Sequence, residues 1–108
     1  MQGKNVVVTG AGCLGASVVK RCLEEGASVT VVDVSEANLE ALGDGARAIR
    51  ADVTDPDAMK KAVAGADIVI HTAAALDGEA ELQEKVNVVG TRTVAEAAAE
   101  AGVERLVH

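Results

Sequence analysis

The 108-residue sequence contains no Phe, Tyr or Trp, only one Pro and only two Cys. Without aromatic side chains the core has to be built from small residues, and 21 Ala and 18 Val supply most of the hydrophobic ones. Such residues suit helices packed closely on a parallel sheet, although they bury less apolar area per residue than aromatic rings. The composition therefore predicts modest stability and is typical of an engineered or reconstructed sequence.

The sequence also lacks an apolar run near the ~18 residues that cross a bilayer, and it lacks the basic region and apolar core of a signal peptide. Positive charge is scarce, because 10 Lys and Arg face 17 Asp and Glu, for a net charge of −7. A surface of that sign gains no affinity by releasing counterions from nucleic acid. We therefore expect a single cytoplasmic domain, residues 1–108, with neither a nucleic-acid nor a membrane partner.

The two cysteines are too far apart for a disulfide if they lie on one helix. Nine residues separate Cys13 from Cys22, or about 13 Å along a helix axis, whereas a disulfide joins Cα atoms up to ~7 Å apart. Two free thiols fit a reducing compartment. Cys13 has no His near it in the sequence, and we interpret its side chain as a packing residue.

Short β-branched runs alternate with helical patterns along the chain. This spacing favours right-handed crossovers and a parallel sheet covered on both faces. The predicted fold is α/β, a doubly wound parallel sheet (Rossmann) of five strands in the order 3-2-1-4-5, with a ligand crevice between strands 1 and 4. The predicted strands are 5–9, 28–33, 47–51, 67–71 and 103–108, and the predicted helices are 14–25, 36–42 after an N-cap Ser35, 56–64 after an N-cap Asp55, and 79–101.

The loop between the first strand and the first helix reads Gly-Ala-Gly-Cys-Leu-Gly. Gly10 allows the tight turn, Gly12 lets the backbone approach a pyrophosphate, and Gly15 lets helix and strand pack closely. The helix amino terminus adds N–H groups and the positive end of a dipole. Because the loop contains no Lys or Arg, its backbone, including Cys13 and Leu14, has to hold the anion. A tight turn that binds nothing is the alternative.

Asp33 ends the second predicted strand, 33 − 15 = 18 residues after the last glycine. A carboxylate ~20 residues after this loop binds the ribose of an adenosine. It favours a 2′-hydroxyl and repels a 2′-phosphate, and Val34 and Ser35 provide no compensating Arg. The loop and the carboxylate together predict NAD, preferred over NADP. A solvated carboxylate is the alternative for Asp33, and S-adenosylmethionine or FAD is the alternative ligand.

Further segments extend the pattern over most of the chain: Val7-Val8-Thr9-Gly10, Asp52-Val53, 67–74, 86–91 and 98–108. With these segments the sequence resembles the extended short-chain dehydrogenase/reductase family, which contains sugar-nucleotide epimerases and hydroxysteroid dehydrogenases. The resemblance implies that Asp52 and Val53 flank the adenine ring. The residues alone also allow Asp52 to cap the turn before Pro56.

The resemblance further implies that the backbone around Ala73 and Ala74 lines the cofactor ribose and pyrophosphate. Ala73, Ala74 and Ala75 follow the fourth strand into the crevice, where small side chains leave room for a dinucleotide; an ordinary Ala-rich loop is the alternative. We interpret Asn87 and Gly90, poor helix formers inside a helix, as structural. His71 is interpreted as a strand-end residue, and we expect no metal site.

Two features depart from the family pattern. The family spaces its glycines T-G-x-x-G-x-x-G, one residue longer than the loop here. Its chemistry uses a Y-x-x-x-K pair and a Ser or Thr, whereas this sequence has no Tyr. We therefore expect no catalytic residues and no enzyme as the chain stands, but a truncated or designed NAD-binding module. A scaffold that binds nothing is the alternative, and an unpaired last strand leaves a homodimer open.

Overall fold

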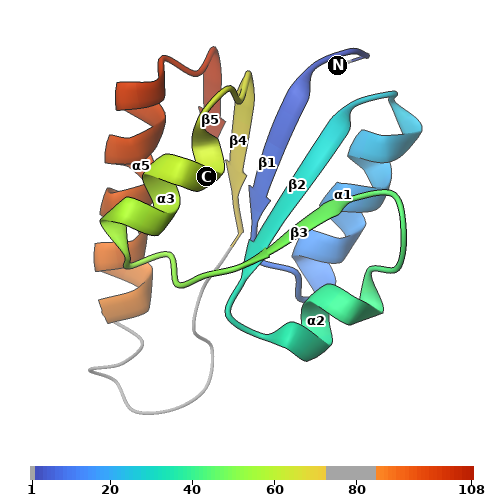
Figure 1. The fold of residues 1–108 in the computed structure, drawn as a ribbon, viewed down its shortest axis with the longest axis horizontal. Coiled ribbons are helices and arrows are strands. Elements are labelled where there is room, and N and C mark those ends of the chain that lie inside the picture. Colours follow the sequence, from blue (N-terminus) through green and yellow to red (C-terminus); the bar gives the residue numbers. More distant parts are fainter. Residues whose placement is uncertain (1, 73–84) are drawn as a thin grey trace.

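The β-branched runs form one parallel five-stranded sheet in the order β3-β2-β1-β4-β5, which confirms the predicted topology. The computed structural model describes residues 2–72 and 85–108. Helices α1 and α2 cover one face of the sheet, and α3 and α5 cover the other (Figure 1). The elements are β1 (Asn5–Thr9), α1 (Cys13–Glu24), β2 (Ser28–Asp33), α2 (Glu36–Ala41), β3 (Arg47–Arg50), α3 (Pro56–Val63), β4 (Ile68–His71), η1 (Lys85–Val89), α5 (Gly90–Ala101) and β5 (Arg105–Val107).

The central strand β1 supplies two separate cores, because alternate side chains of a strand point to opposite faces. Val6 and Val8 pack with the residues of α1 and α2, and Val7 packs with those of α3 and α5. Met59 of α3 is fully buried and is the largest described side chain in this state. Both cores are otherwise built largely from Val and Ala, as the absence of aromatic residues requires.

Three helices begin in different ways. The Ser35 hydroxyl accepts a hydrogen bond from the Asn38 N–H at 3.2 Å and caps α2. The Asp55 carboxylate accepts from the N–H groups of Asp57 and Ala58 and caps α3. Gly12 precedes α1, and no described side chain caps that helix. The first N–H groups of a helix have no partner inside it, so those of α1 lack the side-chain acceptor that the other two helices have.

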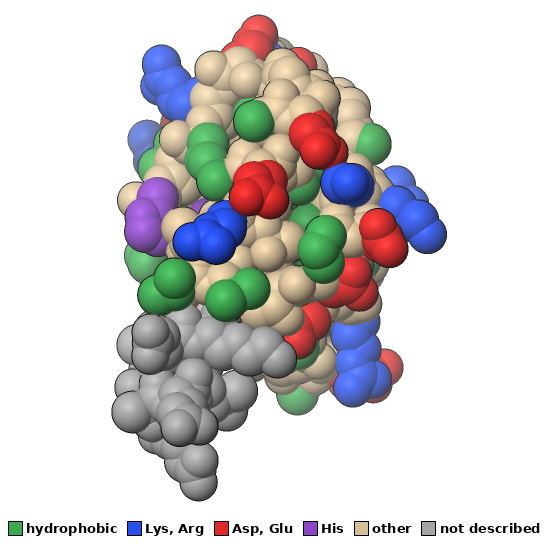
Figure 2. Space-filling model, turned by 90° about the vertical axis from the view of Figure 1, so that its left-hand side faces the viewer, with side chains coloured by type: hydrophobic (Ala, Val, Ile, Leu, Met, Phe, Trp, Pro, Cys, Tyr) green, Lys and Arg blue, Asp and Glu red, His purple; other side chains and the backbone are tan. Residues whose placement is uncertain are grey.

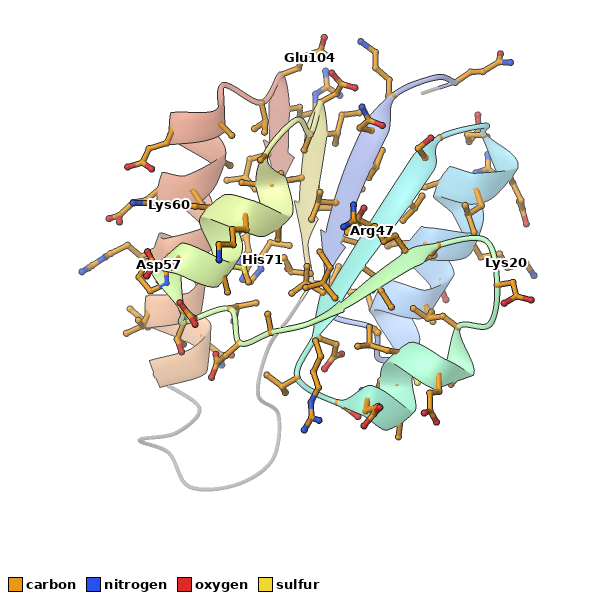
Figure 3. All side chains as sticks on the ribbon, viewed as in Figure 1. Lys20, Arg47, Asp57, Lys60, His71 and Glu104 are labelled. Atoms are coloured by element: carbon orange, nitrogen blue, oxygen red, sulfur yellow. The ribbon has the colours of Figure 1, made fainter. Side chains whose placement is uncertain are left out.

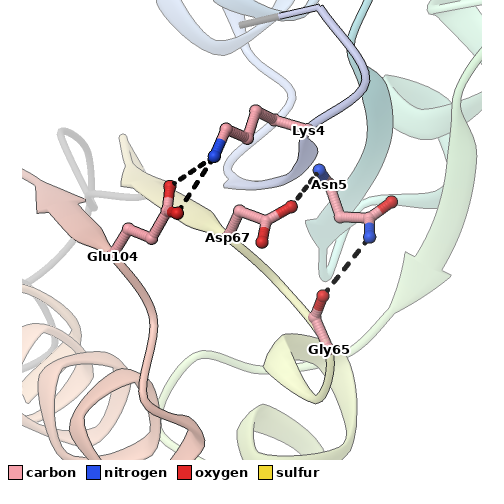
Figure 4. Close-up of polar contacts among 5 residues, drawn as sticks. All are labelled: Lys4, Asn5, Gly65, Asp67 and Glu104. Atoms are coloured by element: carbon pink, nitrogen blue, oxygen red, sulfur yellow. Dashed lines mark hydrogen bonds and ion pairs between the residues drawn. The ribbon is translucent and has the colours of Figure 1, made fainter.

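Side-chain contacts tie the amino ends of the central strands together (Figure 4). The Asp67 carboxylate accepts a hydrogen bond from the Asn5 N–H at 2.8 Å, just before β4 begins. Lys4 and Glu104 form an ion pair at 2.9 Å that joins the two ends of the chain. Both side chains are substantially exposed, so we expect this pair to contribute less than ~1 kcal/mol.

The last predicted helix differs most from its prediction. Its predicted start, Glu79, lies outside the described residues. The described part consists of a short π-helical segment, η1, followed by α5. Gly102 ends α5 with a left-handed backbone (φ 70°), as predicted. Strands β3 and β4 are each one residue shorter than predicted, and β5 is three residues shorter.

The surface carries charge of both signs. On the face formed by α3 and α5, acidic and basic side chains are interspersed (Figure 2), and Lys60 of α3 pairs with Glu100 of α5 at 3.6 Å. Within the two described ranges, no helix is both long and apolar enough to cross a membrane. Strand β5 is an edge strand, and the homodimer expected from it stays a prediction.

Both cysteines are free thiols, as their spacing predicted. Cys22 is buried in the core beneath α1, and burial raises the pKa of its thiol, which makes the thiolate scarce. Cys13 is exposed. Our interpretation of Cys13 as a packing residue is therefore wrong, because the side chain at the first position of α1 faces away from the core that this helix covers.

Candidate functional site

The glycine loop turns back immediately at the carboxyl end of β1. The Gly10 N–H donates to the Val32 carbonyl at 2.7 Å, and Gly10 has φ 98°, a conformation that side chains with a Cβ rarely adopt. The turn brings the chain from the buried strand directly to the start of α1. This is the tight turn that we predicted for Gly10.

Gly15 is the point of closest contact between α1 and the loop. A Cβ added there would overlap the Gly10 carbonyl oxygen and lie 3.0 Å from the Thr72 hydroxyl. Thr72 itself donates to the Thr9 carbonyl at 2.7 Å and so links β4 to β1 beneath the loop. The predicted close packing at Gly15 is confirmed, and Thr72 is a member of this site that sequence reasoning missed.

The first turn of α1 is open. A Cβ added at Gly12 would meet no described atom within 4 Å, and Leu14 is 67% exposed. The first turn of α1 contains no acidic residue. The N–H groups of Cys13, Leu14 and Gly15 therefore present the positive end of a helix dipole, and the described residues leave room beside Gly12 for another molecule.

Asp33 stands at the carboxyl end of β2 and holds the loop in place. Its carboxylate accepts hydrogen bonds from the Ala11 N–H at 2.7 Å and from the Ser35 N–H at 2.8 Å. The Asn38 amide lies 3.5 Å away. A carboxylate offers about four lone-pair positions, so Asp33 keeps acceptors for another ligand. Its bond to the glycine loop was not predicted from the sequence.

An arginine lies beside this corner, although none is close to Asp33 in the sequence. Arg50 pairs with Asp33 in the register of β2 and β3. Its Nε donates to the Val34 carbonyl at 3.1 Å, and its Nη1 lies 3.6 Å from the Glu36 carboxylate. No Arg is close to Asp33 in the sequence, but the pairing of β2 with β3 places Arg50 next to it in the structure. The predicted adjacency of strands 2 and 3 was the signal that could have found Arg50.

Asp52 and Val53 follow β3 on the same edge of the sheet. The Asp52 carboxylate accepts hydrogen bonds from the Thr54 N–H at 2.9 Å and the Thr54 hydroxyl at 2.8 Å. It therefore stabilises the turn before α3, which was one of the two roles left open for it. The Val53 side chain is buried and lies where a Cβ on Gly90 would come within 2.7 Å of it. This contact confirms the packing interpretation of Gly90.

His71 bridges β1 and α5 at the carboxyl end of β4. Its Nδ1 lies 2.5 Å from the Thr9 hydroxyl, and its Nε2 lies 3.1 Å from the Thr91 hydroxyl. Thr91 donates its own proton to the Asn87 carbonyl at 2.6 Å. The Thr91 oxygen must then accept from Nε2–H, so the neutral ring carries its proton on Nε2 and accepts at Nδ1 from Thr9.

Burial lowers the pKa of His71, and the nearby His108 lowers it further. The two rings are stacked, with centroids 5.5 Å apart. The neutral ring is thus the form that suits this position. Among the described residues, no group of three His, Cys, Asp or Glu side chains could hold a metal ion. His71 lies at the end of β4 and links it to β1 and α5 through Thr9 and Thr91.

Besides Asp52 and Val53 after β3, the predicted site residues fall into two groups. Gly10, Gly12, Cys13, Leu14, Gly15 and Asp33 come together around the start of α1, at the carboxyl ends of β1 and β2. Ala73, Ala74 and Ala75 lie outside the described residues. The arrangement offers backbone donors for an anion and a carboxylate for hydroxyl groups, which is the chemistry that a nucleotide requires.

The sheet order and the glycine loop define a doubly wound α/β protein of the Rossmann class. The chain belongs to the 3-beta hydroxysteroid dehydrogenase/isomerase family, whose profile matches residues 6–108. The resemblance to extended short-chain dehydrogenases/reductases is thereby confirmed.

Sequence relatives include enzymes of several kinds. A 3-beta-hydroxysteroid dehydrogenase of Mycolicibacterium neoaurum is 35% identical over 98% of this chain and 31% of its own length. Cinnamoyl-CoA reductase 1 of Arabidopsis thaliana is 39% identical over 97% of this chain and 33% of its own. The chain thus spans about a third of the length of the curated relatives that it matches.

Solved structures agree with this assignment. The Bordetella bronchiseptica enzyme WbmG in complex with NAD superimposes with a TM-score of 0.84 and 31% identity, over 95% of this chain and 36% of that one. The UDP-glucose 4-epimerase of Thermotoga maritima, solved with UDP-glucose, gives a TM-score of 0.86 and 28% identity, over 94% and 36%.

These relatives correct one expectation. We expected no enzyme because the chain contains no Tyr and no Y-x-x-x-K pair. The relatives are a dehydrogenase, a reductase and an epimerase, and the chain matches only about a third of their length. Because the chain matches only about a third of each relative, the absence of Tyr from it does not show whether the protein is an enzyme. Our expectation of no enzyme was therefore wrong.

Proposed function

We propose that residues 1–108 form one dinucleotide-binding domain that binds NAD at the carboxyl ends of β1, β2 and β4. The observation that carries the proposal is the start of α1, which has no cap from a described side chain and an open side at Gly12. The NAD complex of WbmG, at 31% identity, supports the choice of ligand. Bound NAD would supply a hydride acceptor to the chemistry of the whole protein.

The N–H groups of Cys13, Leu14 and Gly15 would hold the pyrophosphate. The chain carries a net charge of −7, so an anion needs local donors, and the helix start supplies them without a charged side chain. Gly12 leaves the approach free, because no Cβ stands between the backbone and the phosphates. Gly10 and Gly15 act indirectly by giving the loop its shape.

Asp33 would accept hydrogen bonds from the adenosine ribose through the lone pairs that Ala11 and Ser35 leave free. We propose NAD in preference to NADP, since a 2′-phosphate would meet this carboxylate at short range. Arg50 could offset that repulsion, but its guanidinium is engaged by Glu36 and the Val34 carbonyl. Asp52 and the backbone near Val53, Ala73, Ala74 and Ala75 complete the proposed site.

Calorimetric titration with NAD tests the proposal, because a chain without aromatic residues offers no intrinsic fluorescence. We expect NAD to bind more tightly than NADP, S-adenosylmethionine or FAD. Gly12→Val should abolish binding of NAD while the far-UV circular dichroism stays near that of the parent. Unchanged affinity in Gly12→Val would place the phosphates elsewhere and overturn the proposal.

A second pair of variants tests the carboxylate. Asp33→Ala should weaken NAD binding by about 1–3 kcal/mol, the usual cost of losing hydrogen bonds to a charged acceptor. Asp55→Ala is the matched control, because it also removes a carboxylate that accepts two backbone N–H groups but does so at α3. Equal affinity in Asp33→Ala and the parent would remove Asp33 from the ribose site.

A further inference from the structure

A cavity lies at the amino-terminal ends of the strands, opposite the glycine loop. Its volume is about 410 Å³. It opens where β1, β2 and β3 begin and where α3 ends. The lining residues are Asn5, Val6, Val7, Ser28, Val29, Thr30, Arg47, Ile49, Lys61, Ala62, Ala64, Gly65 and Ala66.

The register of the sheet explains how polar and apolar groups meet in this cavity. Val7 pairs with Thr30, and Thr30 pairs with Arg47, so the three side chains lie in a row on one face of the sheet. Val7 belongs to the core beneath α3 and α5, which identifies that face. The Arg47 side chain reaches from β3 toward the side of the sheet that carries α3 (Figure 3), and Lys61 of α3 lines the same cavity.

The cavity is positively charged in an acidic protein. None of the Asp and Glu side chains that the structure describes lines it. Its two cations, Arg47 and Lys61, take part in none of the ion pairs between described residues. The next cations on the same elements behave differently: Arg50 of β3 pairs with Glu36, and Lys60 of α3 pairs with Glu100.

The rest of the lining combines an apolar floor with neutral polar groups. Val7, Ile49 and Ala62 belong to or pack against the core of this face, and they offer a surface that a fully hydrated ion would not use. The hydroxyls of Ser28 and Thr30 add hydrogen-bonding groups. A ligand that matches this lining has one negative head and a short apolar body.

We propose that this cavity binds a small organic monocarboxylate. Arg47 and Lys61 hold the carboxylate, and the apolar body lies over Val7, Ile49 and Ala62. Guanidinium groups pair well with carboxylates, because their N–H groups match the two oxygens. The volume falls within the range of about 300–1,000 Å³ of small-molecule sites. The proposal is independent of the NAD site, which lies at the opposite ends of the same strands.

Titration of the ¹⁵N-labelled full chain with hexanoate, followed by amide chemical shifts, tests the proposal. We expect saturable shifts at Thr30, Arg47 and Ala62. Hexan-1-ol and hexylamine carry the same apolar body without the negative head and should produce no saturable shifts there. Inorganic phosphate should bind much more weakly than hexanoate. Equal binding of hexanol or of phosphate would overturn the assigned ligand class.

Charge variants sharpen the test. Arg47→Gln and Lys61→Gln should each raise the Kd for hexanoate about tenfold, the loss expected for one charged hydrogen-bonding partner. The matched controls Arg50→Gln and Lys60→Gln lower the net charge equally and should leave the Kd unchanged. An equal loss in all four variants would show general surface electrostatics, and the absence of saturable shifts in the parent would refute the site.

One more variant separates this cavity from the nucleotide site, where a carboxylate could also meet the start of α1. Gly12→Val should abolish NAD binding and leave hexanoate binding intact. If Gly12→Val removed hexanoate binding as well, the carboxylate would belong to the glycine loop, and the proposed site between Arg47 and Lys61 would be refuted. If it removed neither, the proposed NAD site would fail while the cavity stood.

Discussion

The first turn of α3 carries its own cap, whereas the first turn of α1 has none from any described side chain. Asp55 occupies the N–H groups of α3 with its carboxylate, and Pro56 removes a further donor. Gly12 has no side chain to offer at the start of α1, and a Cβ added to it would meet no described atom within 4 Å. Both helices face the same loss of hydrogen bonds at their amino ends. This difference supports the proposal that the start of α1 binds the pyrophosphate of NAD.

The glycines of the two regions sharpen this comparison. At the α1 loop, the backbone of Gly10 lies so close to Gly15 that no side chain fits between them. Gly65, just after α3, has no described atom near its missing Cβ and is required only for its positive φ of 79°. Tight packing on one side of the α1 loop and open space at Gly12 on the other give the loop a fixed shape with an accessible backbone.

Gly15→Ala should have the largest effect. The added methyl group would overlap the Gly10 carbonyl, and relief requires movement of α1 against β1, so we expect a loss of at least ~3 kcal/mol in the free energy of unfolding. Urea denaturation followed by circular dichroism measures it. Gly12→Ala is the control and should cost less than ~1 kcal/mol. Similar losses in both variants would show that the two sides of the loop are equally sensitive to an added side chain, contrary to the geometry.

Asp55→Ala should come next. It removes the cap of α3, and the loss of an N-cap typically costs ~1 kcal/mol of stability. The same urea titration checks it, with Asp57→Ala as a control that removes an acid from the first turn of α3 without removing the cap. If Asp55→Ala lost less unfolding free energy than Asp57→Ala, the cap of α3 would contribute little to stability, and the contrast with the uncapped α1 would lose its energetic basis.

The stability of the protein should fall as the pH drops below about 6.5, the ordinary pKa of His, and His71 should contribute to that fall. Its pKa is lowered in the folded state, so the unfolded chain binds a proton more readily in the window between the two pKa values. Protonation therefore favours unfolding there, and the contribution of the neutral ring is lost as the pH falls through the folded pKa.

His71→Gln should flatten this pH dependence, because it removes the titrating group beneath the loop. Thermal unfolding between about pH 5 and 7.5, followed by circular dichroism, measures the slope. His108→Ala removes the second cause of the lowered pKa and should reduce the slope only partly. An unchanged slope in His71→Gln would assign the effect to other groups.

Glu36→Gln should have the smallest effect. Removal of the Glu36 charge frees Arg50 from its ion pair beside Asp33 and should raise the affinity for NADP by a few-fold, in line with the ~0.2–1 kcal/mol of an exposed pair. The affinity for NAD should stay the same. Competitive calorimetry with both dinucleotides measures the ratio, and a fall in NADP affinity would show that Arg50 does not face the 2′ position.

Local sequence was sufficient for the parts of the fold that depend on neighbours along the chain. Strands β1 and β2 have the predicted bounds, because each is a β-branched run bounded by glycine or a polar residue. Ser35 and Asp55 cap the predicted helices, since a cap acts across three residues. The closeness of Gly10 and Gly15 follows from a loop of six residues.

Contacts between distant residues came only with the tertiary structure. Thr9, His71 and Thr91 meet across 62 and 20 residues of sequence, and the pairing of β2 with β3 brings Arg50 beside Val34. Neither contact leaves a local pattern, because each depends on the register between strands that are far apart in the chain.

The sequence by itself thus determined the alternation of strands and helices, the sheet order that right-handed crossovers impose, and the glycine loop, because hydrophobic periodicity and backbone conformation are local properties. The tertiary structure decided which side chains share a surface: the bond of Asp33 to the loop, the burial of Val53, and the cavity that Arg47 and Lys61 both line. Those contacts depend on strand register and helix packing, which a linear pattern does not encode.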